Sequence, residues 1–345
     1  MTILALETSC DDTCAAVVDE DGRIRSNVIS SQRAHDRFGG VVPEIASRHH
    51  LELVNLIVQQ SLLEAGIGLD QIDRVAVTQG PGLIGALLVG LSTAKGLAAA
   101  RELPLVPVDH LQGHVAANFL LSEEGGEACE PPFLCLIASG GHTLLAHVRD
   151  HRGFHTLGRT LDDAAGEAFD KGARMLGLGY PGGPALERLA AEGDPEAFEF
   201  PTSGSRSRGG RGATRAFGRS LDFSFAGLKT SLLYKLRELG ESEGRERAAD
   251  LAASFQAAIV DHLVVRAEEA LELIGLDRLA VGGGVAVNGE LRRRVRALGA
   301  SVHVPTSALC TDNAAMIGAA ACFAQAVPYP QYLGLDAYAT GERPG

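Results

Sequence analysis

Two histidines that are four residues apart give the chain its clearest chemical signal. His110 and His114 follow the apolar run 103–108, and Asp109, directly before them, suits the N-cap of a helix. Side chains four apart on a helix share one face, so both imidazoles could reach a single metal ion. The spacing fits equally well two histidines that bind nothing near a helix start. The pair is therefore a candidate metal site that needs further ligands.

The same spacing occurs in zinc metalloproteases, but one required residue is missing. Those enzymes carry a glutamate directly after the first histidine as general base, and this chain has Leu111 there. A protease site is therefore excluded. A third ligand could come from Asp312, which follows the predicted strand 302–305 and precedes the predicted helix 314–326. An aspartate in that position could also be the helix N-cap.

Composition describes an acidic globular protein. The chain has 345 residues, 46% of them hydrophobic, and a formal net charge of −12. It is long enough for two domains, and its charge argues against a protein that coats a polyanion with its whole surface. Six cysteines form no CxxC pair, no signal peptide pattern opens the chain, and the longest apolar run, 83–91, is too short to span a membrane. We expect a cytoplasmic protein with no membrane contact.

The elements that would position the histidines occur in a repeated pattern. A strand, a small polar turn, a strand, a glycine turn and a third strand are predicted twice, over 3–29 and again over 132–157, each time before helices. The first of these helices, 43–65, begins with Pro43. Such duplication predicts two similar α/β domains facing each other across a cleft.

Glycine-rich turns favour a bound nucleotide. Neither G-x-G-x-x-G nor a P-loop is present, but each repeat has a polar hairpin turn, at 8–13 and 139–143, and a Gly-Gly-Gly loop opens at Gly282. Backbone N–H groups in such turns suit phosphate oxygens. Residues 203–220 contain five arginines and no acid, so they form either a solvated loop or a contact to a phosphate backbone. The last residues of the chain are expected to be a tail.

Taken together, the motifs resemble the bacterial TsaD (Gcp, Kae/YgjD) family, the tRNA N6-adenosine threonylcarbamoyltransferases. The resemblance runs from about residue 3 to residue 325 and rests on these segments in this order: 6–13, 39–44, 80–83, 110–114, 139–143, 162–171, 180–184, 222–230, 282–286 and 310–313. It implies a two-lobed actin-like (ASKHA) fold of duplicated RNase H-like domains with a central cleft. One lobe would comprise 1–121 joined by 301–330, and the other 130–300 with the basic insertion 203–220.

The resemblance also implies an activity. It is the transfer of threonylcarbamoyl from threonylcarbamoyl-AMP to N6 of the adenosine next to the anticodon, in tRNAs that read codons beginning with A, with release of AMP. The implied metal ligands are His110, His114 and Asp312, holding one divalent transition metal ion, iron rather than zinc. The implied adenylate contacts are Ile137, Ala138, Ser139, Gly140, Gly141, Asp170, Gly183 and Asn288.

A base and partners complete these expectations. Asp11 or Asp12 could accept the proton that the adenosine amine loses, or could instead orient the metal site or water. The resemblance implies a paralogous, TsaB-like subunit and a small, TsaE-like P-loop ATPase as partners, besides tRNA. The turn departs from the family in having Asp12 where glutamate is usual, the insertion before Asp222 is longer than expected, and Asp109 replaces a common histidine.

Two other functions remain open. An actin-like kinase acting on a sugar or a carboxylate would share the lobes, but it gives no reason for the histidine pair. A nucleotide-gated scaffold would bind partner proteins without chemistry. A bound transition metal together with transfer of labelled threonine to tRNA would separate both from the transferase.

Overall fold

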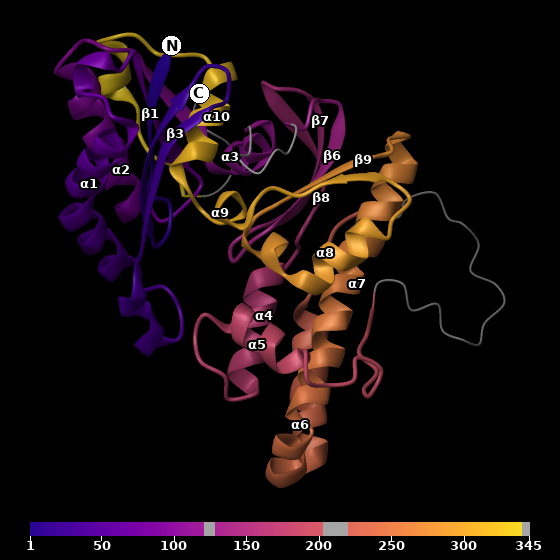
Figure 1. Ribbon diagram of the computed structural model, residues 1–345. Helices are drawn as coiled ribbons and strands as arrows, with labels where there is room; N and C mark the ends of the chain where they lie inside the picture. The colour runs from indigo at the N-terminus through magenta and orange to yellow at the C-terminus, as the bar shows by residue number, and fades with distance from the viewer. Residues whose placement is uncertain (121–127, 203–219, 340–345) are drawn as a thin grey trace. The chain divides into compact units, whose positions relative to one another are not determined.

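The computed structural model describes residues 1–120, 128–202 and 220–339 of the chain (Figure 1). The arginines of the predicted basic insertion, within 203–219, lie outside the described residues. The chain forms two compact units. Unit 1 comprises Met1–Pro131, Arg149–Phe154 and Pro305–Gly345, and unit 2 comprises Pro132–Val148 and His155–Val304.

Unit 1 is built on a five-stranded sheet with the order β3-β2-β1-β4-β5. β1 pairs antiparallel with β2 and parallel with β4, and β4 pairs parallel with β5. Ile3 to Glu7 of β1 are fully buried, as expected for a central strand covered on both faces. The strands are β1 (Thr2–Glu7), β2 (Asp12–Asp19), β3 (Ile24–Ser31), β4 (Arg74–Gly80) and β5 (Leu105–Asp109).

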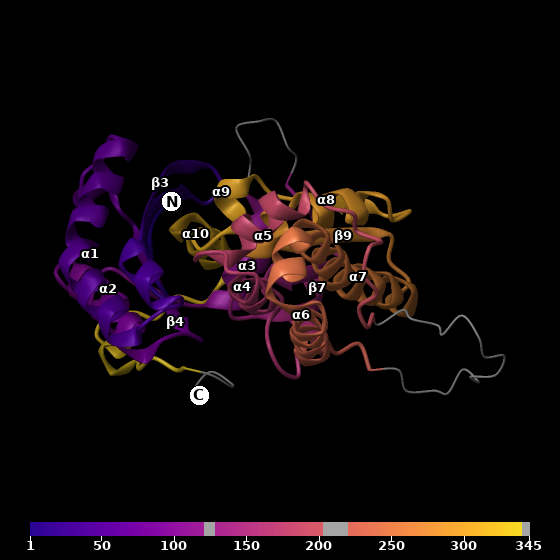
Figure 2. The ribbon, with the colours of Figure 1, turned by 90° about the horizontal axis from the view of Figure 1, so that it is seen from below.

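Helices cover both faces of this sheet. Leu4 and Leu6 share a core cluster with residues of α1 and α2, whereas Ala5 points to the other face, against Gly318 of α10. Figure 2 shows α1 and α2 side by side on one side of the unit. The helices of unit 1 are α1 (Pro43–Ala65), α2 (Ile84–Ala99), α3 (His110–Ala116), α9 (Ser307–Cys310) and α10 (Ala314–Phe323), with 3-10 turns η1 (Arg33–Phe38), η2 (Leu69–Gln71), η3 (Ala117–Phe119) and η5 (Gln331–Gly334).

Unit 2 repeats the strand arrangement of unit 1. Its sheet has the order β10-β9-β6-β7-β8, so β6, β7, β8, β9 and β10 correspond in turn to β1, β2, β3, β4 and β5. The central strand again has one antiparallel and one parallel neighbour. The predicted duplication is therefore confirmed at the level of topology. The strands are β6 (Phe133–Ala138), β7 (Thr143–Asp150), β8 (Gly153–Arg159), β9 (Arg278–Gly282) and β10 (Ser301–His303).

The helices of unit 2 include one long apolar helix. α7 is, among the described residues, the one helix long and apolar enough to cross a membrane, but 67% of its apolar window is buried in the fold. Leu251, Phe255, Ile259 and Leu263, which recur at helical spacing on one face of α7, are fully buried. The unit contains α4 (Ala165–Met175), α5 (Gly182–Ala190), α6 (Ala226–Glu246), α7 (Ala248–Ile274) and α8 (Gly289–Arg296), with the 3-10 turn η4 (Gly284–Val287).

The prediction of a C-terminal tail was wrong for the described residues, and 340–345 lie outside them. α10 ends at Phe323, and Val327 then bridges antiparallel to Leu105. Tyr332 is fully buried in the core cluster beside α1 and α2. These residues were misjudged because their apolar positions have no regular period. They fold onto unit 1 through side chains that fill gaps in an existing core.

Candidate active site

The two histidines begin a short helix that is capped as predicted. β5 ends at Asp109, whose Oδ1 accepts hydrogen bonds from the backbone N–H of Leu111 at 2.8 Å and of Gln112 at 3.1 Å. These bonds satisfy two of the donors that a helix start leaves unpaired. Both imidazoles are buried, His114 completely. A rigid strand and a capped turn therefore hold the pair.

Asp312 approaches the histidines because another residue caps α10. The N-cap is Asn313, whose Oδ1 accepts a hydrogen bond from Met316 N at 3.0 Å. The carboxylate of Asp312 instead has Oδ1 3.2 Å from Nε2 of His114 and 3.6 Å from Nε2 of His110. The alternative role of Asp312 as N-cap is thus wrong. Ligand atoms of the three side chains lie within 4.8 Å of one another.

Close packing of α3 against α10 brings these ligands together. A Cβ placed on Gly113 would lie 2.8 Å from Cδ1 of Ile317 and 3.2 Å from Cγ of Met316. Any larger residue at this position would force the side chain of Ile317 to shift. The missing side chain in the middle of the H-L-Q-G-H motif therefore has a structural reason.

Glu7 supports His110 from behind and was missed by the sequence analysis as a functional residue. Its Oε2 lies 3.0 Å from Nδ1 of His110, and Ser9 Oγ lies 3.1 Å from the same nitrogen. The Glu7 carboxylate also accepts hydrogen bonds from Thr78 Oγ1, at 2.5 Å, and from Ser9 N. Carboxylates commonly bind the second ring nitrogen of a metal-ligating histidine. The signal for this role in the sequence was an acidic residue, Glu7, at the end of an apolar predicted strand.

The pKa directions describe a pocket that stabilises positive charge. Burial raises the pKa of Glu7, but the nearby His110 more than offsets this and the pKa is lowered overall. Burial lowers the pKa of His110, but Asp312 and Glu7 outweigh it and raise the pKa to about 9. The buried carboxylate of Glu7 and the partly exposed carboxylate of Asp312 thus flank the imidazole, and a cation in this pocket offsets their charge.

The donor set fits a divalent transition metal ion. Both ring nitrogens of His114 are buried without a hydrogen-bond partner among the described residues, and Asp312 approaches Nε2 without the alignment of a hydrogen bond. A buried imidazole that satisfies no hydrogen bond is unusual unless something else binds it. Two imidazoles and one carboxylate are typical ligands of zinc or non-haem iron.

Asp11 lies in the turn between β1 and β2, and Asp12 is the first residue of β2, in the same unit. Asp12 begins β2 opposite Ser31 of β3. Burial raises the pKa of Asp12 to about 7; a hydrogen bond with Ser31 acts against this, and the charges of Asp312 and Asp11 add to it. A carboxyl group with this pKa can exchange a proton near neutral pH.

In unit 2, the predicted phosphate-binding turn follows β6. The side chains of Ile137 and Ala138 are fully buried in the sheet, so they could offer only backbone atoms to a ligand. Ser139 closes the turn, its N donating to His142 O at 2.8 Å, while Gly140 and Gly141 are exposed. A Cβ on Gly283 would lie 2.3 Å from Ala138 O, so the glycine-rich loop packs directly against this turn.

The remaining predicted adenylate contacts are helix caps. Oδ1 of Asp170 accepts hydrogen bonds from Gly182 N at 2.8 Å and Gly183 N at 3.1 Å, at the start of α5. Asn288 caps α8 through Leu291 N and donates from Nδ2 to Gln256 at 2.8 Å. Asp170 and Asn288 therefore both cap the start of a helix, a role that needs no bound ligand.

Comparison with known proteins decides the family. The model of the TsaD family, described as tRNA N6-adenosine threonylcarbamoyltransferase, matches residues 23–319. The chain belongs to the TsaD family. Curated proteins named tRNA N6-adenosine threonylcarbamoyltransferase from Clostridium perfringens and Clostridium botulinum are each 48% identical to it, over 93% and 94% of this chain and 92% of theirs. The resemblance inferred from the motifs is confirmed.

Solved structures extend the TsaD comparison to the fold. The activator of 2-hydroxyisocaproyl-CoA dehydratase from Clostridium difficile with bound ADPNP has a TM-score of 0.52 at 15% identity and covers 94% of each chain. HypF from T. kodakarensis has a TM-score of 0.57 at 15% identity, over 93% of this chain and 47% of that one. With the duplicated sheets, these neighbours confirm the predicted actin-like (ASKHA) fold.

Proposed function

We propose that this chain transfers threonylcarbamoyl from threonylcarbamoyl-AMP to N6 of the adenosine next to the anticodon, in tRNAs that read codons beginning with A, and releases AMP. Family membership supports a tRNA-modifying transferase. The observation that carries the proposal is the group formed by the buried His110 and His114 and the partly exposed Asp312, with Glu7 behind His110. It favours the transferase over the kinase and the scaffold, neither of which needs such a group.

The three side chains would hold one divalent metal ion. Two imidazoles and a carboxylate leave coordination positions for a substrate, an arrangement common in non-haem iron proteins, so we propose iron rather than zinc. When bound, the ion supplies a Lewis acid for the carbonyl of the threonylcarbamoyl group. Glu7 keeps the His110 ring in one orientation and one tautomer, with Nε2 toward the ligand position.

The adenylate part of the donor would bind in unit 2. Exposed backbone at Gly140 and Gly141 suits the phosphate, which can approach a turn that lacks side chains. Asp170, Gly183 and Asn288 would contact the ribose and the adenine, with groups that also cap helices. Ile137 and Ala138 would contribute backbone only, since their side chains are buried.

Asp12 is the better candidate for the base, with Asp11 beside it. The exocyclic amine of adenosine is a weak nucleophile because its lone pair is delocalised into the ring, so positioning contributes much of the rate. Attack on the carbonyl carbon forms the new N–C bond, the bond to AMP breaks, and the amine loses one proton. A carboxylate with a pKa of about 7 can accept that proton near neutral pH.

We further propose that the chain works with partner proteins in the cytoplasm. A net charge of −12 is poorly suited to capturing tRNA alone. A paralogous TsaB-like subunit would complete the tRNA surface, and a small TsaE-like P-loop ATPase would reset the enzyme after each reaction.

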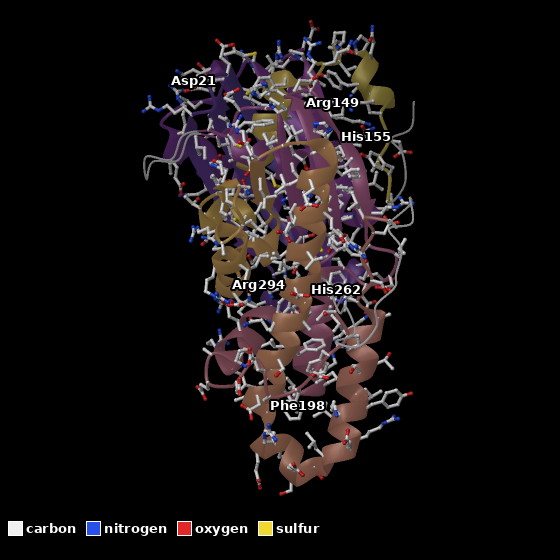
Figure 3. The ribbon with its side chains drawn as sticks, turned by 90° about the vertical axis from the view of Figure 1, so that its right-hand side faces the viewer. Asp21, Arg149, His155, Phe198, His262 and Arg294 are labelled. Atoms are coloured by element: carbon white, nitrogen blue, oxygen red, sulfur yellow. The ribbon has the colours of Figure 1, made fainter. Side chains whose placement is uncertain are left out.

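Reconstituted transfer of labelled threonine to tRNA, together with metal analysis, tests the function. His110→Ala should abolish the modified adenosine. His155→Ala is the matched control, because His155 lies exposed on β8, far in sequence from the ligands, and should retain full activity (Figure 3). Full activity in His110→Ala would refute the proposed metal role.

A further inference from the structure

The C-terminal residues of the described chain run along the ends of β4 and β5, next to the start of α3. Tyr338 N donates a hydrogen bond to Gln79 O at 3.2 Å, and Gly82 N donates to Ala339 O at 3.1 Å. Gln79 Nε2 donates to Asp336 O at 2.8 Å. Backbone and side-chain bonds thus fix the segment 336–339 to the end of β4 and to the loop that follows it.

Gly80 allows this segment to come close. Its φ of 155° is rare for residues with a side chain, and a Cβ there would lie 2.2 Å from Tyr338 O and 2.9 Å from two carbons of the Tyr338 ring. In the sheet, Gly80 stands opposite Asp109 after an irregularity in the register. The ring of Tyr338, the backbone of Gly80 and the N-cap of α3 are therefore neighbours.

The hydroxyl group of Tyr338 contacts that N-cap directly. Oη donates a hydrogen bond to Oδ2 of Asp109 at 2.6 Å, while Oδ1 of the same carboxylate accepts the two backbone bonds at the start of α3. Tyr338 is only 6% exposed. A hydrogen bond from a buried hydroxyl to a carboxylate is among the stronger kinds. It restricts the rotation of the carboxylate that sets the first turn of α3.

We propose that Tyr338 is a positioning residue for the metal site, acting through Asp109. The hydroxyl orients the Asp109 carboxylate, the carboxylate fixes the first turn of α3, and that turn carries His110 next to the cap and His114 one turn later. The inference rests on the proposed metal site. It assigns to the C-terminal segment a role in tuning metal affinity that goes beyond filling the core.

A second tyrosine, Tyr332 of η5, provides a matched control. Tyr332 is fully buried, and its hydroxyl has no hydrogen-bond partner among the described residues. Tyr332→Phe and Tyr338→Phe remove the same oxygen atom from buried rings that lie six residues apart. A role in packing alone predicts similar effects from the two substitutions, whereas the positioning role predicts an effect on metal binding from Tyr338→Phe only.

The test is Zn²⁺ binding by the full chain after treatment with a chelator, measured in competition with a metallochromic dye. We expect Tyr338→Phe to weaken Zn²⁺ binding by about tenfold, the low end for groups that orient metal ligands, and Tyr332→Phe to change it less than about twofold. Asp109→Ser keeps a capping oxygen but is too short to reach Tyr338. Asp109→Ser should weaken Zn²⁺ binding by a similar factor. The double variant with Tyr338→Phe should bind Zn²⁺ as tightly as Asp109→Ser alone.

Each contrary outcome has a distinct meaning. Unchanged binding in Tyr338→Phe, or equal losses in Tyr338→Phe and Tyr332→Phe, would overturn the positioning role while leaving the metal site intact. Additive losses in the double variant would overturn the route through Asp109. Failure of the unsubstituted chain to bind Zn²⁺ would overturn the proposed metal site itself, and this inference with it.

Discussion

Glu7 lies directly behind His110, with Oε2 of the carboxylate 3.0 Å from Nδ1 of the imidazole, although 103 residues separate them in the chain. Glu7 is fully buried and ends the central strand of its sheet. The contact places a negative charge at the ring nitrogen that faces away from Asp312. It explains how a short helix can present a buried imidazole in one fixed orientation.

Replacing the charge of Glu7 should weaken metal binding without removing a ligand. Glu7→Gln keeps the shape of the side chain, but its amide stabilises the ring much less than a carboxylate does. We expect metal affinity to fall by about tenfold, measured by the same dye competition. Glu20→Gln, an exposed acid of unit 1, is the control and should bind normally. Equal affinity in Glu7→Gln and the unsubstituted chain would contradict the supporting role of Glu7.

Two glycine substitutions should have opposite effects on stability. Gly113→Ala forces a methyl group against Ile317 and Met316, so we expect a loss of about 1–3 kcal/mol in the free energy of unfolding. Gly96→Ala places its methyl group in open space on α2, where alanine favours the helix by up to about 1 kcal/mol. Urea denaturation measures both. A Gly113→Ala chain as stable as the parent would contradict the tight packing of Gly113 against Ile317 and Met316.

Asp12 should make the stability of the metal-free chain depend on pH. Its pKa is about 7 when folded and near the ordinary 3.8 when unfolded. Between these values the unfolded chain releases a proton that the folded chain keeps, so stability falls as pH rises, and above pH 7 the loss is complete. Asp12→Asn lacks this loss. Its stability relative to the parent should therefore grow from pH 4 to pH 7 and then level off; a difference independent of pH would contradict the raised pKa.

Removal of the metal should abolish transfer, and its replacement should distinguish iron from zinc. Chelator-treated chain is expected to lose threonylcarbamoyl transfer to tRNA, because the two imidazoles and the carboxylate then have no Lewis acid to hold. Added Fe²⁺ under anaerobic conditions should restore more activity than Zn²⁺. Full restoration by Zn²⁺ alone would contradict the proposed preference for iron. Full activity without any metal would show that the transfer does not need a metal.

Much of this protein follows from local patterns in its sequence. The repeated strand and turn pattern predicted two similar domains, and the two sheets have matching strand orders. The four-residue spacing of His110 and His114 predicted a shared face, because helical periodicity is a local property. Leu111 excluded a protease for the same kind of reason. The order of the motifs along the chain was enough to indicate the family.

Only the tertiary structure decided how these pieces meet. Glu7 could not be assigned to His110 from sequence, since their contact depends on β1, β4 and β5 lying in one sheet. The sequence allowed either Asp312 or Asn313 to cap α10. In the structure the backbone places Asn313 at the N-cap, so the Asp312 carboxylate faces the histidines. Tyr338 reaches Asp109 because Gly80 has no side chain in the way. Such contacts join residues far apart in the chain, and their free energy depends on distances that no local pattern encodes.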